Sequence, residues 1–333
     1  MTEDVLVEIF NPPKYFSHRS QELTANICGR LSSQVRRARY QINAGEWLDL
    51  PQGEPRVPSP LFTIEITKEK LLQGRNELTI EVLGSDNVLE RNTLDFEYDS
   101  SLVQLPTEVD WLTDKNLDVQ DGYWETFEID GEWRVRPKPG FEEYDRILNV
   151  TGAFSGGRRV ETDLVFRKTG WLGWRGKRAY GFGVLTLWGG HLEDTTVRPR
   201  RGWLFGLGWF FAPRRSPGQE HGPGLILEFG SKIGEQKSNA RFDFFPLIPK
   251  KKVRYSVVAE AVSVVNKDGK HLHWQQRLKW WEASEPEPEK WLEGSESPLL
   301  PDGEYAVSLL THRTQVDFGP VKISPLAPLV LDT

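Results

Sequence analysis

The stretch Asn76–Gly84, "NELTIEVLG", constrains the fold more than any other short segment of this chain. Its apolar residues Leu78, Ile80 and Val82 alternate with polar ones, and this period of two places them on one face of a β-strand. Similar strand-like runs, separated by turn residues, occur at 5–10, 22–31, 35–50, 61–67 and 92–99. Short strands at this spacing predict a β-sandwich.

The later part of the chain continues the pattern. Strand-like runs occur at 133–137, 158–167, 180–188, 224–230, 253–264, 271–281, 305–312 and 315–324. No segment combines the caps and the 3.6-residue period of a helix. Composition agrees, because 30 Gly and 22 Pro interrupt helices while 13 Trp and 17 Phe favour strands.

We therefore predict an all-β protein with two domains. A β-sandwich over residues 1–104 is expected to precede a jelly roll over residues 105–333. The boundary falls in the polar, proline-containing segment 99–111. We expect each domain to fold alone.

Charge and chain ends limit the classes of function. A net charge of -6 and a pI near 5.7 argue against nucleic-acid binding. No run approaches the about 20 apolar residues of a membrane span, and the N-terminus lacks the apolar core of a signal peptide. The expected location is cytoplasmic, or exported if a leader has been trimmed. Cys28 is the single cysteine, which excludes an internal disulfide.

The N-terminal part resembles a known family. "LLQGRNELTIEVLGSDN" (71–87) is similar to bacterial immunoglobulin-like domains found beside carbohydrate-active modules. The matching residues are Leu71, Gly74, Asn76, Leu78 and Thr79. The resemblance covers roughly residues 4–100 and implies an immunoglobulin-like spacer or interaction domain, not a catalyst.

The C-terminal part resembles bacterial laminin-G-like domains of the concanavalin A-like lectin/glucanase superfamily. The segments that carry this resemblance, in order, are 118–125, 143–150, 181–191, 197–203, 277–291 and 309–326. Within 277–291, the element "WEASEPEPEKW" is the most specific. The resemblance implies a two-sheet jelly roll whose concave face often holds a glycan, but it implies no single activity.

Two carboxylates are candidates for catalysis. Glycoside hydrolases of the resembled superfamily carry E-x-D-x-x-E on one strand, since cleavage needs two acids. Here Glu161 and Asp163 share a strand face, while Phe166 replaces the second glutamate. The alternative is that both acids line a solvated face.

Tryptophans and a histidine are candidates for ligand binding. An indole offers stacking area to the C–H face of a sugar, and we predict this role for Trp171, Trp174, Trp188 and Trp203. For Trp188, which lies inside a strand, the core is an equal alternative. His191 follows two glycines in "LWGGHLED" (187–194) and can bind a ligand hydroxyl, cap a turn, or shuttle a proton beside Asp194.

These features together predict recognition of a glycan or a small polyhydroxylated ligand on an aromatic-lined concave face. One alternative is an enzyme that uses the same cleft on a saccharide, as a hydrolase or lyase, or on a cytoplasmic biosynthetic intermediate. Another is a purely structural interaction module. Because members of the resembled superfamily often carry a structural calcium, Asp118, Asp121 and Asp317 are its predicted ligands.

Overall fold

The computed structural model describes residues 5–16, 24–50, 52–54, 57–109, 111–112, 117–142, 145–150, 152–168, 180–191, 205–211, 214–216, 219–221, 224–230, 241–244, 249–295 and 302–332. Within these ranges the single helical element is the 3-10 turn Lys68–Lys70, and every other element is a β-strand. The all-β prediction is confirmed. In the same ranges, no helix has the length and apolar character needed to cross a bilayer.

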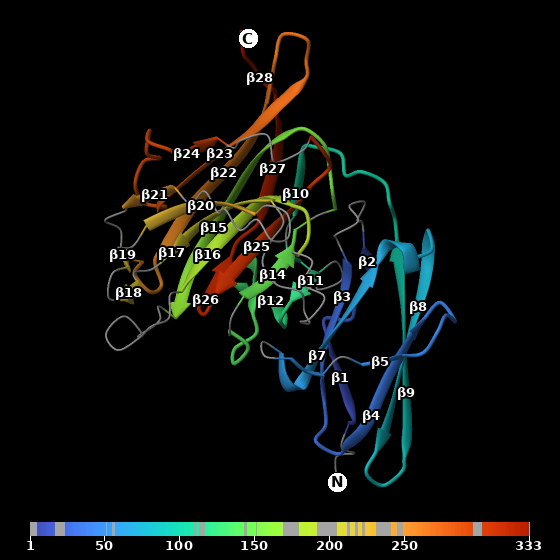
Figure 1. Cartoon of the computed structure of the whole chain (residues 1–333). Helices are drawn as coiled ribbons and strands as arrows, with labels where there is room; N and C mark the ends of the chain where they lie inside the picture. The colour runs from blue at the N-terminus through green and yellow to red at the C-terminus, as the bar shows by residue number, and fades with distance from the viewer. Residues whose placement is uncertain are drawn as a thin grey trace.

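The N-terminal part is a sandwich of two sheets (Figure 1, blue to cyan). In spatial order, one sheet contains β1 (Val7–Phe10), β3 (Thr24–Leu31), β7 (Val57–Thr67) and β6 (Gln52–Glu54). The other contains β2 (Tyr15–Phe16), β9 (Leu89–Tyr98), β8 (Gly74–Gly84), β4 (Val35–Ile42) and β5 (Leu48–Asp49). Leu78, Ile80 and Val82 of β8 are all fully buried in the core between the sheets, as their alternation predicted.

Asn76 organises the turn before β8 and so accounts for the spacing of Leu71, Gly74 and Asn76 in the sequence motif of this sandwich. Its buried side chain accepts a hydrogen bond from the backbone N–H of Leu72 (2.8 Å) and donates to the carbonyls of Leu72 and Gly74 (2.8 Å each). Gly74 adopts a φ of 87°, which favours glycine. The motif therefore fixes the turn that leads into β8. The immunoglobulin-like assignment itself stays a prediction.

The C-terminal part is a larger two-sheet sandwich with jelly-roll architecture, as predicted (Figure 1, green to red). The ten-stranded sheet runs β12 (Trp124–Ile129), β13 (Glu132–Pro137), β26 (Gln315–Phe318), β15 (Gly157–Lys168), β22 (Arg254–Val265), β23 (His271–Glu282), β24 (Leu292–Ser295), with β10 (Thr107–Val109), β27 (Val321–Leu326) and β28 (Leu329–Val330) attached to it. The seven-stranded sheet runs β11 (Asp118–Asp121), β14 (Asp145–Asn149), β25 (Ala306–His312), β16 (Gly181–Trp188), β17 (Phe205–Phe211), β20 (Gly224–Gly230) and β21 (Arg241–Phe244). A small ribbon pairs β18 (Arg214–Ser216) with β19 (Gln219–His221).

Alternation along β15 separates the core from the outer face of the ten-stranded sheet. Val160, Leu164 and Phe166 point into the core between the two sheets and are at most 1% exposed. Glu161 and Asp163 take the intervening positions and are partly exposed on the opposite face. The sequence prediction that these two acids share one strand face is confirmed.

The two sandwiches pack against each other. Phe10 stacks on Tyr123 with ring centroids 4.4 Å apart, and Phe141 meets the ring of Phe10 edge-on at 5.2 Å. The side chain of Asn11 donates to the carbonyl of Trp124 (2.7 Å) and accepts from its N–H (2.9 Å). This junction joins the sandwiches directly, although the predicted boundary at 99–111 and the independent folding of each part stay predictions.

Candidate functional site

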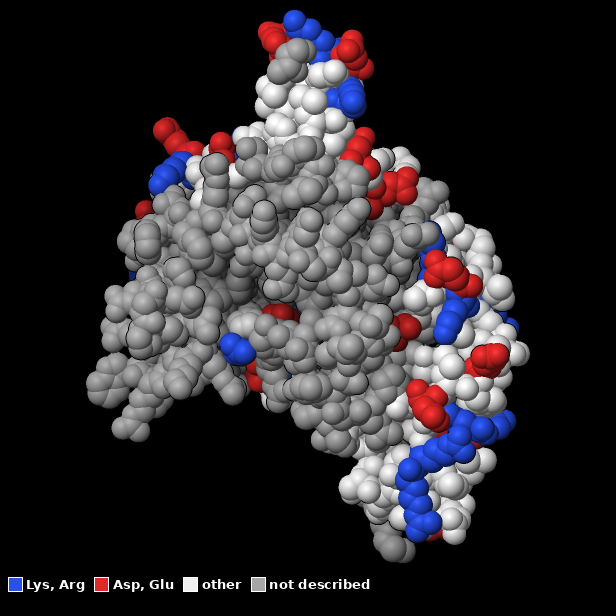
Figure 2. All heavy atoms as spheres, viewed as in Figure 1, with Lys and Arg blue, Asp and Glu red and all other residues white. Residues whose placement is uncertain are grey.

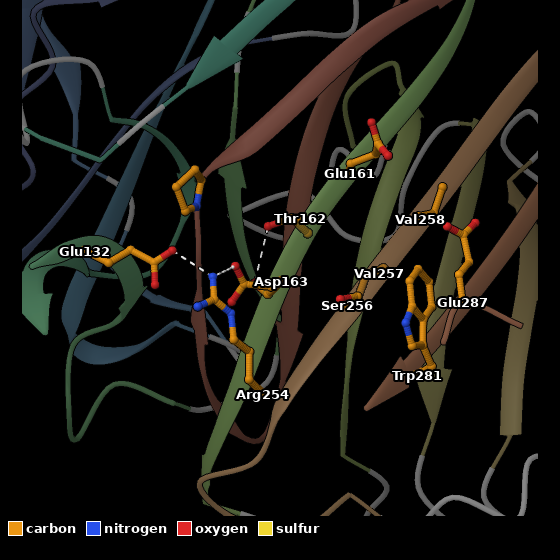
Figure 3. Close-up of a pocket in the computed structure, with 11 residues that line it drawn as sticks. Glu132, Glu161, Thr162, Asp163, Arg254, Ser256, Val257, Val258, Trp281 and Glu287 are labelled. Atoms are coloured by element: carbon orange, nitrogen blue, oxygen red, sulfur yellow. Dashed lines mark hydrogen bonds and ion pairs between the residues drawn. The ribbon is translucent and has the colours of Figure 1, made fainter. Parts of the chain in front are cut away.

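A groove lies on the outer face of the ten-stranded sheet, where β15, β22 and β23 are neighbours (Figure 3). The strand register sets Asp163 opposite Ser256, and Ser256 opposite Trp281. One step along the same face, Glu161 lies opposite Val258. The short side chains of Ser256 and Val258 form the floor, while larger side chains rise on either side. The groove has a volume of about 410 Å3.

One wall is a closed set of ion pairs. Asp163 accepts from Arg134 (2.5 Å) through one oxygen and from Arg254 (2.6 Å) through the other. Glu132 accepts from the same two arginines, at 3.1 Å and 2.7 Å. Figure 3 shows Glu132, Arg254 and Asp163 joined on this side of the groove. Both oxygens of Asp163 are therefore already committed to charge-assisted hydrogen bonds.

The other wall consists of Trp281 and Glu287 (Figure 3). Glu287 belongs to the loop after β23, and Lys279 pairs with it and donates to the carbonyl of Pro288 (3.1 Å). The hydrogen bond from Lys279 lowers the pKa of the Glu287 carboxyl, so this group is ionised at neutral pH. The ammonium of Lys279 also lies 4.0 Å from the ring centre of Trp291, which fixes the loop to the sheet.

Arg159 lies between Glu161 and Glu287. Its guanidinium donates to Glu260 (2.7 Å) and Glu161 (3.0 Å), and one nitrogen lies 3.8 Å from Glu287. Burial opposes the charge of Arg159, but the hydrogen bonds to Glu260 and Glu161 outweigh it and raise the pKa of the guanidinium. Glu161 and Glu287 thus converge on one cation.

This arrangement suits recognition of a polyhydroxylated ring. A partly exposed indole supplies an apolar stacking surface, and carboxylate oxygens and a serine hydroxyl accept hydrogen bonds from ligand hydroxyls. Acid–base catalysis by the predicted pair is less well supported, since Glu161 and Asp163 lie on one strand and Asp163 is held by two arginines. Their catalytic role stays a prediction.

The predicted ligand residues occupy a different place. Trp188 is the last residue of β16 in the seven-stranded sheet, His191 follows three residues later, and their rings meet edge-on at 5.1 Å. Trp188 is fully buried, which matches the core alternative, and His191 is 4% exposed. Trp171, Trp174, Trp203 and Asp194 lie outside the described residues. A ligand-binding role for this set stays a prediction.

The three aspartates predicted to bind calcium do not come together. Asp118 and Asp121 lie on β11 of the seven-stranded sheet, whereas Asp317 lies on β26 of the ten-stranded sheet and pairs with Arg167. Arg146 lies 3.1 Å from Asp121, and two side-chain amides donate to Asp118 at 2.8 Å each. These donors do not fit a calcium site, and the described ranges contain no cluster of three potential metal-ligating side chains.

Sequence reasoning missed most of the groove. Among the residues it did not select are Glu132, Arg254, Ser256, Trp281 and Glu287. A signal for one of them exists in the run 271–282. Trp274, Leu278 and Trp280 occupy inward positions, so the period of two places Trp281 outward. An outward tryptophan in the middle of a sheet was the available clue.

Comparisons with known proteins find similar solved structures but no matching family. The chain matches no protein-family model and no curated protein. One similar solved structure is the carbohydrate binding module CBM66 from Bacillus subtilis, at 11% identity and a TM-score of 0.36, with 62% of this chain and 94% of that chain covered. Another is the exoplasmic/lumenal domain of VIP36 in its Ca2+-bound form, at 10% identity and a TM-score of 0.38, with 61% of this chain and 83% of that chain covered. Peanut lectin is similar at 7% identity and a TM-score of 0.35, with 66% of this chain and 96% of that chain covered. TM-scores at this level carry no conclusion about the function of this chain.

Proposed function

We propose that this chain recognises glycans through the groove between Asp163 and Trp281. The observation that carries the proposal is a partly exposed indole standing over a floor of small side chains, with hydrogen-bonding groups on both sides. Sugar rings present one apolar face and a rim of hydroxyls, so they match a flat aromatic wall flanked by acceptors. The sequence resemblance to the lectin/glucanase superfamily agrees with this class of ligand.

The enzyme alternative has weaker support in the described residues. A general acid in this groove needs a carboxyl that stays protonated near neutral pH. Glu287 is the opposite case, because Lys279 lowers the pKa of its carboxyl. Asp163 has no oxygen free of an arginine. The groove therefore favours binding over turnover.

A panel of immobilised oligosaccharides, probed with the full chain, tests the proposal. Trp281→Ala should weaken binding of any captured glycan by about tenfold, which corresponds to about 1.4 kcal/mol of lost stacking. Trp47→Ala is the matched control, because Trp47 is also partly exposed and also lies near a cationic side chain, Arg39, but in the N-terminal sandwich. Equal affinity of Trp281→Ala and the parent chain, or no captured glycan, contradicts the proposal.

A further inference from the structure

The residues that line the groove carry more negative than positive charges. Four carboxylates line it, from Glu132, Glu161, Asp163 and Glu287, against one guanidinium, from Arg254. A count alone does not select a ligand, because several of these charges are already paired. The position of each pair decides which charges a ligand meets.

At the Asp163 end the charges cancel. Arg134 and Arg254 face Glu132 and Asp163 in a closed set of two cations and two anions. Arg254 donates to both carboxylates through a single nitrogen, so its charge is compensated twice. Among the described lining residues, no cation is left over to bind an anionic ligand.

At the Trp281 end the negative charges are more exposed. The side chains of Glu161 and Glu287 are 38% and 45% exposed, against 14% for Asp163. Arg159 approaches both of them, but its shorter contact of 2.7 Å is to Glu260, which is buried. Lys279 pairs with Glu287 and also donates to the carbonyl of Pro288. A ring stacked on Trp281 therefore meets two carboxylates that share their cationic partners with other groups.

A primary ammonium on the ligand is the complementary group for the carboxylates at the Trp281 end. It can donate to Glu161 and Glu287 as charge-assisted hydrogen bonds, and the face of Trp281 adds a favourable cation–π contribution. A ligand carboxylate in the same position meets like charges, and this repulsion opposes binding. The walls thus select for the charge on the sugar as well as for its ring.

We infer that the groove takes amino sugars with a free amine in preference to N-acetylated or neutral sugars, and rejects uronic acids. This inference rests on the proposed function. It names the chemical class of the ligand, and it assigns Glu161 and Glu287 as the residues that determine this specificity while Trp281 supplies general affinity.

Calorimetric titration of the full chain with three probes tests the inference: a glucosamine oligomer, its fully N-acetylated counterpart and an oligogalacturonate. The glucosamine oligomer should bind at least about tenfold more tightly than the N-acetylated one, and the uronate should not bind. Added salt should reduce this preference and leave the binding of the N-acetylated oligomer nearly unchanged.

The double variant Glu161→Gln/Glu287→Gln should bind both amino-sugar oligomers equally, at the affinity of the N-acetylated one. Glu293→Gln is the matched control, because Glu293 is exposed and pairs with Arg277 at 3.9 Å on the same sheet face but does not line the groove. Thermal melts of each variant show whether it is folded.

Two failures are distinguishable. If the N-acetylated oligomer binds, Trp281→Ala weakens that binding, and the free amine brings no advantage, the inference is wrong and the proposed function stands. If no probe binds, the inference is wrong, and the panel of immobilised oligosaccharides decides on the proposed function. If Trp281→Ala binds all probes as the parent chain does, both are wrong.

Discussion

Arg158 and Arg159 are neighbours in β15, yet the two faces of the ten-stranded sheet hold their charges in different ways. Arg158 points inward and is fully buried. Its guanidinium donates to the carbonyls of Tyr305 (3.0 Å) and Gly156 (3.1 Å from Nε) and lies over the ring of Phe154, 4.4 Å from the centroid. Burial lowers the pKa of Arg158 to about 9.

Arg159 points outward, where Glu260 and Glu161 raise the pKa of its guanidinium. The inner face therefore holds a cation with backbone dipoles and aromatic rings, and the outer face holds one with formal charges. The difference indicates separate uses: the inner charge ties the two sheets together, while the outer charges can be rearranged around a ligand.

The largest expected effect comes from removing the inner charge. Arg158→Ala should lower the free energy of unfolding by about 3–5 kcal/mol, because it leaves a cavity and removes the guanidinium donor from the carbonyls of Tyr305 and Gly156. Arg159→Ala should cost about 1 kcal/mol, since Glu161 and Glu287 are partly solvated and Arg277 still pairs with the buried Glu260. Urea unfolding followed by tryptophan fluorescence measures both. Equal losses of unfolding free energy for the two variants would contradict the difference between the inner and outer faces.

Asp121 tests whether burial also disfavours the charged form of an acidic group. Burial raises the pKa of Asp121 to about 6, with Asp145 and Glu65 adding to the shift and Arg146 opposing it. Between about pH 4 and pH 6 the folded state then binds more protons than the unfolded state, so the contribution of Asp121 to stability is present at acid pH and is lost as the pH rises.

Replacing Asp121 by Asn removes this titration. The stability of Asp121→Asn relative to the parent chain should rise by up to about 3 kcal/mol between about pH 4 and pH 7. Urea unfolding midpoints across this range provide the measurement, and Asp95→Asn is an exposed control. Parallel pH profiles for Asp121→Asn and the parent would contradict the effect of burial.

A smaller effect is expected at the centre of the outer network. Glu260 is 2% exposed and joins Arg159 to Arg277. Glu260→Gln should cost about 2 kcal/mol, because it leaves two cations in a partly desolvated position. The exposed Glu293→Gln should change the unfolding free energy by less than about 0.5 kcal/mol. If Glu260→Gln is as harmless as Glu293→Gln, the outer face does not depend on this buried anion.

The smallest expected effect concerns calcium. Chelation with EDTA should leave the melting temperature unchanged. The three aspartates that were predicted to bind calcium are instead paired with arginines or accept hydrogen bonds from side-chain amides. A folded state that binds calcium would instead melt lower after chelation, by mass action. Differential scanning calorimetry with and without EDTA would detect that decrease, which would restore the calcium prediction.

Local patterns were sufficient to predict the strands and their faces. Alternation placed Leu78, Ile80 and Val82 in a core and Glu161 with Asp163 on one outer face, and both predictions are confirmed. Burial of Trp188 was left open for a physical reason. All eight residues of β16 are buried, so the strand offers no alternation from which an exposed side could be identified.

Pairing between distant strands was not predictable from the same patterns. The groove depends on a register that sets Asp163 beside Ser256 and Ser256 beside Trp281, and nothing local in β15 specifies its partner residues in β22. The ion pairs have the same origin, since Glu132, Asp163 and Arg254 come from three separate strands. Glu161 and Asp163 were therefore found, and the wall opposite them was not.

The stacked rings of Phe10, Tyr123 and Phe141 have a practical consequence for dissecting the chain. A fragment that begins after the predicted boundary loses Phe10 and leaves Tyr123 and Phe141 uncovered side by side. Exposed aromatic patches promote self-association of otherwise folded domains. Biophysical work on the isolated C-terminal sandwich therefore calls for a solubilising substitution at this patch, and aggregation of an unmodified fragment would reflect a missing cover rather than a failure to fold.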